Sequence, residues 1–235
     1  MTRLILVRHG QTEWNRVEHY RGRADIPLND TGLAQAEATG RRIAVEWGRE
    51  VVALYSSPLT RTVQTAEAIG RHLKLPVSPF QGLIDLDMGL WQGLTPEQVQ
   101  VKWPELYRIW HTSPSEVLFP DGESLAQMQS RAMSGLHELI RRHDDRTIIL
   151  VSHTDVNRSI LLGVLGLGSD SLWTLRQDNC AINVIEAAPT LASSSFTLVS
   201  MNDTAHLHAW AGFERDYGGA VHVTSVNDPQ SSSDA

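Results

Sequence analysis

Cysteine is almost absent from this sequence, since Cys180 is the only one in 235 residues. A single thiol excludes an internal disulfide and any multi-cysteine metal site, and it fits a reducing compartment. Long apolar runs are missing as well, because no stretch approaches the roughly 18 consecutive apolar residues that cross a membrane. The first seven residues are too few for a signal peptide. We therefore expect a cytoplasmic protein with no membrane association.

Basic residues are in the minority, with 20 Lys and Arg against 27 Asp and Glu, and the formal net charge is −7. Nonspecific binding of DNA or RNA draws on clustered basic side chains, so this balance speaks against nucleic acid as a partner. A hydrophobic fraction of 41% is ordinary for a globular protein with a sizeable core. We expect one domain over residues 1–217, whereas the small and polar residues 218–235 predict a disordered tail.

Strand-like and helical patterns alternate along the first part of the chain. The apolar run 3–7 is typical of a strand buried on both faces of a parallel sheet. Helical spacing follows over residues 29–48, a second strand is predicted over 51–55, and a second helix over 59–73. Such alternation favours a parallel sheet covered by helices.

The middle of the chain, residues 89–123, is richer in Trp, Pro and Gly, and we interpret it as an insertion of short helical pieces over the sheet edge. The pattern then resumes with a helix over 124–142, a strand over 147–151 and a helix over 156–165. Two late strands, near 181–186 and 196–201, are expected to close the sheet. The predicted fold is a three-layer α/β/α sandwich with a mainly parallel central sheet.

Three of the predicted strands end in polar turns that carry reactive side chains. Arg8 and His9 follow the first strand, Arg61 lies just after the turn that ends the second, and His153 follows a later one. Ligand sites in open α/β sheets lie beyond the carboxyl ends of the strands, so these turns are expected to converge. Arginine forks hold phosphate oxygens in bidentate fashion, and a neutral imidazole can attack phosphorus. The set therefore suits a phosphate monoester.

A leaving alkoxide also needs a proton. A carboxylic acid that burial or a nearby phosphate keeps protonated can supply it. Asp85 and Asp87, in the turn-rich stretch 82–93, are the local candidates.

Several short motifs, in order along the chain, resemble those of the histidine phosphatase superfamily, the group that includes cofactor-dependent phosphoglycerate mutase. They span about residues 3–207 and read LVRHGQT with a following Asn15, DIPL, SSPL with a following Arg61, GLWQG, GES and VSH. The resemblance implies a phosphoglycerate mutase-like fold with no metal and no other cofactor.

The resemblance also implies a role for each matching residue. His9 is expected to be the phosphorylated nucleophile, and the phosphoryl group is expected to be bound by Arg8, Asn15, Arg61 and His153.

The family places an acid four residues before Gly89, and this residue is Asp85. Family members usually carry Glu there, so the shorter side chain leaves Asp87 or a water molecule as alternative contributors. The loop that follows Asn15 is expected to bind substrate through Arg21 and Gly22. We hypothesise that Arg21 recognises a carboxylate or a second phosphate.

The predicted function is that of a metal-independent phosphatase that hydrolyses a small phosphate monoester through a phosphohistidine intermediate. A phosphorylated acid such as phosphoserine or a phosphoglycerate derivative fits the set, as do α-ribazole phosphate and sugar phosphates. The expected partner is a small phosphorylated metabolite. A homodimer stays open, because phosphatases of the family are often dimers.

Two other functions fit parts of the pattern. A mutase would return the phosphoryl group to a second oxygen of the substrate, but Lys102 and Arg108 are the only Lys or Arg between Gly93 and Asp121, which favours a phosphatase. A noncatalytic regulator that binds a phosphorylated ligand can use the same fold. Retention of both histidines and both arginines argues against it.

Two further groups of residues invite a functional interpretation. His206 and His208 form an H-x-H spacing, yet no nearby carboxylate or cysteine spacing completes a metal site. The tryptophans of the insertion, Trp91, Trp103 and Trp110, are interpreted as packing anchors.

Overall fold

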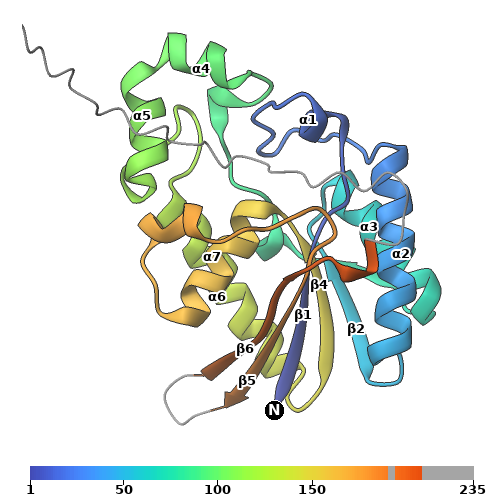
Figure 1. Cartoon of the computed structure of the whole chain (residues 1–235). Helices are drawn as coiled ribbons and strands as arrows, with labels where there is room; N and C mark the ends of the chain where they lie inside the picture. Colours follow the sequence, from blue (N-terminus) through green and yellow to red (C-terminus); the bar gives the residue numbers. More distant parts are fainter. Residues whose placement is uncertain (190–193, 208–235) are drawn as a thin grey trace, which may run out of the picture.

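The computed structural model describes residues 1–189 and 194–207, which contain a six-stranded sheet in the order β3-β2-β4-β1-β5-β6 (Figure 1). The parallel strands are β1 (Thr2–Arg8), β2 (Val51–Ser56), β3 (Val77–Pro79) and β4 (Thr147–Ser152). The late strands β5 (Ile182–Pro189) and β6 (Ser194–Asp203) are longer than expected and join in the antiparallel direction. The prediction of a mainly parallel sheet is confirmed.

Helices cover both faces of the sheet (Figure 1). One face carries α2 (Asp30–Trp47) and α3 (Thr60–Leu73), and the other carries α6 (Leu125–Arg142) and α7 (Thr154–Leu165). Strand β1 contributes side chains to the hydrophobic clusters on both faces of the sheet, because successive side chains of a strand point to opposite faces. Leu4 and Leu6 belong to the cluster that includes Leu136 of α6, whereas Ile5 packs in the cluster that includes Ile43 of α2. This arrangement confirms the three-layer architecture.

Polar side chains fix where two of these helices begin. Asn29 Oδ1 accepts a hydrogen bond from the Gly32 amide at 2.8 Å, which caps α2. Ser124 and Gln127 form a reciprocal capping box at the start of α6. Both helices start within about two residues of the position that the sequence predicts.

The segment 89–123 folds into short helical pieces: η2 (Gly89–Trp91), α4 (Pro96–Lys102), α5 (Pro104–Thr112) and η3 (Pro114–Glu116). Trp91 and Trp110 are buried, and each meets the Phe119 ring edge-on, with centroid distances of 5.0 and 5.2 Å. The interpretation of these two tryptophans as packing anchors is confirmed. In Figure 1, α4 and α5 lie beyond the carboxyl ends of the strands rather than over a sheet edge, and α1 (Glu13–Arg16) lies at the same end of the sheet.

Short 3₁₀ turns complete the described chain: η1 (Gln81–Leu83), η4 (Ser169–Thr174) and η5 (Ala205–Leu207). The expected disordered tail, residues 218–235, lies outside the described residues. Within the described ranges, none of the helices has the length and apolar character needed to cross a membrane.

Candidate active site

The carboxyl ends of β1, β4 and β2 bring the two histidines together. These strands are neighbours in the sheet, and the turns that follow them are tied to β4, because the His9 and Ser57 amides donate to the Ser152 and Val151 carbonyls, each at 3.0 Å. The ring centroids of His9 and His153 are 5.4 Å apart. The convergence expected from the strand ends is therefore present.

His9 is held in one tautomer by its own turn. Its Nδ1 lies 2.7 Å from the Gly10 carbonyl oxygen, which can only accept a hydrogen bond. The proton therefore resides on Nδ1, and Nε2 keeps its lone pair. Burial, followed by the positive charges of Arg61 and Arg8, lowers the pKa of His9 well below its ordinary value, so the ring is neutral.

His153 contacts three polar groups and is fully buried. Its Nε2 lies 2.8 Å from Ser57 Oγ, and its Nδ1 lies 3.2 Å from Arg61 Nε and 3.3 Å from an Asp85 carboxyl oxygen. Burial and then the charge of Arg61 lower the pKa of His153 well below its ordinary value. A neutral imidazole in this place can donate one hydrogen bond to a phosphoryl oxygen.

Arg61 has no exposed surface and spans the centre of the site. Its Nη2 donates to Asp85 Oδ2 at 2.9 Å and to the Gly22 carbonyl at 2.8 Å, and its Nη1 donates to the Ala24 carbonyl at 2.8 Å. The arginine therefore connects the start of α3 with the loop after α1 and with the acid.

Arg8 and Asn15, the remaining predicted phosphate ligands, are also buried. Arg8 Nη1 donates to the Gln177 carbonyl at 2.6 Å. Asn15 Oδ1 accepts from the Thr12 amide at 2.9 Å, which leaves the Nδ2 amide as the group able to donate to a phosphate oxygen.

The two candidate acids have separate surroundings. Asp85 is 6% exposed and contacts Arg61 and His153. Burial raises the pKa of Asp85 above its ordinary value, although the charge of Arg61 opposes the shift. Asp87 instead pairs with Arg23 at 3.2 Å and accepts from the Gly89 amide at 3.0 Å. Asp85, and not Asp87, therefore faces Arg61 and His153.

The loop that contains the predicted substrate residues borders this site. Arg21 Nη1 donates to the Trp14 carbonyl at 3.1 Å. The charge of Arg21 contributes, after burial and the charge of Arg61, to the lowered pKa of His9 and of His153. Gly22 has a φ of +49°, a conformation that favours glycine, and a Cβ there would lie 2.5 Å from Gln92 Oε1, so the Gln92 side chain would have to move. The Gly22 carbonyl accepts a hydrogen bond from Arg61.

Five residues without a predicted role contact a candidate site residue or its backbone: Ser57, Gln177, Arg23, Glu123 and Arg131. The SSPL and GES motifs contain Ser57 and Glu123 and were the available signals. The other three contacts depend on the tertiary structure.

Other features of the described chain show no comparable chemistry. No group of three or more His, Cys, Asp or Glu able to hold a metal ion occurs within residues 1–189 and 194–207. His206 Nε2 contacts Thr39 Oγ1 at 3.0 Å, and His208 lies outside the described residues.

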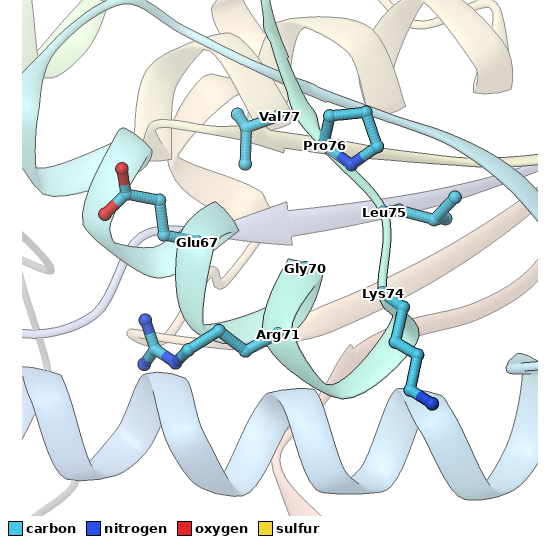
Figure 2. A pocket seen from close by; sticks show the side chains of 7 residues that line it. All are labelled: Glu67, Gly70, Arg71, Lys74, Leu75, Pro76 and Val77. Carbon is cyan, nitrogen blue, oxygen red and sulfur yellow. The ribbon is translucent and has the colours of Figure 1, made fainter.

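A pocket of about 470 Å³ at the C-terminal end of α3 is lined in part by Arg71 and Lys74 (Figure 2). Arg71 is paired with Glu37.

The family model for the histidine phosphatase superfamily (branch 1) matches residues 4–204. The chain belongs to this superfamily. It is 35% identical over 207 residues to phosphoserine phosphatase 1 of Hydrogenobacter thermophilus, and the match covers 88% of this chain and 95% of that protein. As a histidine phosphatase, the chain is a phosphoric monoester hydrolase.

Solved structures support the same relationship. The Bacillus stearothermophilus YhfR structure has a TM-score of 0.81 and 26% identity, and the match covers 88% of this chain and all (100%) of that one. An Entamoeba histolytica phosphoserine phosphatase mutant in complex with phosphoserine has a TM-score of 0.76 and 28% identity, with the same coverage of 88% and 100%. The fold is therefore phosphoglycerate mutase-like, as the sequence motifs predict.

Proposed function

We propose that this histidine phosphatase hydrolyses a small phosphorylated acid through a phosphohistidine formed on Nε2 of His9. The observation that carries the proposal is the 2.7 Å hydrogen bond from His9 Nδ1 to the Gly10 carbonyl. It directs the Nε2 lone pair, rather than an N–H group, toward an incoming phosphorus atom.

In the first step, the Nε2 lone pair forms a bond to phosphorus while the bond from phosphorus to the ester oxygen breaks. Asp85 gives its proton to that oxygen, and the alcohol leaves. Arg8, Arg61 and His153 bind the equatorial oxygens, where the negative charge of the transition state is concentrated, and Asn15 adds an amide donor.

In the second step, a water oxygen attacks the phosphorus of the phosphohistidine. The Asp85 carboxylate takes a proton from this water, the bond from phosphorus to Nε2 breaks, and inorganic phosphate leaves. His9 and the protonated Asp85 are thereby restored.

The substrate class is proposed from the loop after α1. The positive charge of Arg21 contributes to the lowered pKa of both histidines, and a carboxylate on the substrate can pair with its guanidinium. The phosphoserine phosphatases among the relatives support a phosphorylated amino acid or hydroxy acid. Such metabolites are soluble, and we propose that the enzyme acts on them in the cytoplasm.

The test compares phosphate release from a panel of small phosphomonoesters by the wild type and by His9→Ala, with EDTA present. We expect release that survives EDTA, favours phosphorylated acids and disappears in His9→Ala. A labelled intermediate that is acid-labile but stable in alkali would identify the phosphoramidate bond. Release that persists in His9→Ala would contradict the proposal.

The same panel tests the substrate class. Arg21→Ala is expected to raise KM for phosphorylated acids by about 10-fold with little change for a neutral ester, because one charge-assisted contact is lost. Arg16→Ala is the matched control, since Arg16 pairs with Glu13 at the surface. An unchanged KM for every acidic substrate would remove Arg21 from the proposal.

A further inference from the structure

Four charged residues form a network behind Asp85, on the side of its backbone. Residues 84–88, which contain Asp85, form the segment that we call the acid loop. Asp87 belongs to this loop, Arg23 comes from the loop after α1, Glu123 from the end of the insertion, and Arg131 from α6. We call these four residues the acid-loop clamp. Nothing in the hydrolytic steps above uses them.

The clamp holds the backbone of the acid loop at two successive carbonyls. The Asp85 carbonyl oxygen accepts from Arg131 Nη2 at 2.8 Å and from Arg23 Nε at 3.2 Å. The Ile84 carbonyl accepts from Arg131 Nη1 at 2.6 Å. The carboxyl group of Asp85 meanwhile contacts Arg61. Clamp and active site therefore hold different groups of the same residue.

Glu123 joins the two arginines. Its Oε1 accepts from Arg131 Nη2 at 2.7 Å and from Arg23 Nη2 at 3.2 Å, and its Oε2 accepts from Arg131 Nε at 3.2 Å. The Asp87 amide also donates to Oε1, at 2.9 Å. Burial alone would raise the pKa of Glu123, but the hydrogen bonds from Arg131 and the Asp87 amide outweigh it and lower that pKa, so the clamp carboxylate is ionised.

Such control of the backbone matters because aspartate is short. Its carboxyl group stands one methylene from Cα, so backbone position largely sets its reach. A general acid must come within about 2.6–3.2 Å of the oxygen that it protonates. A misplacement of about 1 Å can cost about 100-fold in rate.

We propose that Glu123 and Arg131 are positioning residues that fix the Asp85 backbone so that its short side chain reaches the leaving oxygen. This inference rests on the proposed role of Asp85 as the proton donor. Neither residue is proposed to touch the substrate. Their effect on catalysis passes through Asp85.

Leaving-group dependence separates this role from simple stabilisation of the loops. An alkyl phosphate releases a strongly basic alkoxide and needs the proton, whereas p-nitrophenyl phosphate releases a weakly basic phenolate that does not. Arg131→Lys keeps the charge but loses the planar fork that bridges the carbonyls and Glu123. Arg142→Lys is the matched control, because Arg142 lies on the same helix and pairs with Glu138 at the surface.

We expect Arg131→Lys to lower kcat/KM for the best alkyl phosphate of the panel by about 10-fold or more. For p-nitrophenyl phosphate the change should stay within about 3-fold, and Arg142→Lys should alter neither value. Glu123→Gln provides a second variant with the same expected selectivity and serves if Arg131→Lys folds poorly. Equal losses of kcat/KM for both esters, or no loss for the alkyl ester, would contradict the positioning role of Glu123 and Arg131.

Asp85→Asn separates this outcome from failure of the proposed function. One outcome is that Asp85→Asn lowers kcat/KM for the alkyl ester alone while both clamp variants lower it equally for the two esters. That result would contradict the positioning role of the clamp and leave Asp85 as the proton donor. An unselective loss in Asp85→Asn would remove Asp85 as the proton donor, and the clamp proposal would fail with it.

Discussion

In the proposed mechanism, His9 must be neutral to attack phosphorus while Asp85 must be protonated to donate to the leaving oxygen, both at the same pH. The ordinary pKa values are 6.5 for His and 3.8 for Asp, which would leave almost no enzyme in that form. Burial lowers the pKa of His9 and raises that of Asp85, because a low-dielectric site disfavours both charged forms. The two shifts act together to increase the active form.

These shifts predict the pH dependence of kcat/KM. The acidic limb, where His9 loses its proton as pH rises, should lie below 6.5, and the alkaline limb, where Asp85 loses its proton, should lie above 3.8. Asp85→Asn should remove the alkaline limb for an alkyl phosphate and leave the acidic limb in place. Profiles corrected for ionisation of the substrate phosphate check this, and an alkaline limb that persists in Asp85→Asn would assign it to another group.

The sequence does not distinguish between the two candidate acids, Asp85 and Asp87. Asp85 and Asp87 lie two positions apart in one turn, and both are chemically able to donate a proton. In the structure, one carboxyl group faces Arg61 and the other pairs with Arg23. Both partners are far from the aspartates in sequence, so spacing alone carries no information about them.

The start of α6 links a helix cap to the acid-loop clamp. Ser124 follows Glu123 directly in the chain, and its Oγ accepts a hydrogen bond from the Gln127 amide at 3.2 Å. Ser124→Ala should lower the free energy of unfolding by about 1 kcal/mol, because an N-terminal amide of the helix loses its partner. Urea denaturation measures the change.

Ser130→Ala is the control for this prediction. Ser130 is exposed in the middle of α6, where alanine has the higher helix propensity. Its free energy of unfolding should stay within about 0.5 kcal/mol of the wild type or rise slightly. Equal destabilisation by both substitutions would show that capping by Ser124 contributes nothing specific.

Strand β4, in the interior of the sheet, connects the two halves of the site. It pairs with β1, which leads to His9, and with β2, which leads toward Arg61. Leu150, at the centre of β4, is fully buried. Leu150→Ala should lower the free energy of unfolding by about 2–5 kcal/mol, because it removes buried methyl groups and leaves a cavity.

Denaturant unfolding followed by both activity and circular dichroism tests this prediction. The two transitions should shift together, since every turn of the site depends on the one sheet. Val199→Ala, on the exposed face of β6, should change stability by no more than about 0.5 kcal/mol. A similar loss for Val199→Ala and Leu150→Ala would contradict the assignment of the core.

The amino-acid sequence alone predicts the succession of strands and helices, the family, and the turns that carry His9, Arg61 and His153. These features follow from local periodicity, capping residues and short motifs, which contiguous residues encode. Three features became visible only in the folded chain: the late strands join the sheet antiparallel, Asp85 rather than Asp87 faces Arg61, and the acid-loop clamp contacts the Asp85 backbone. Those outcomes depend on contacts between residues distant in the chain, and packing and burial select among partners that local sequence leaves equivalent.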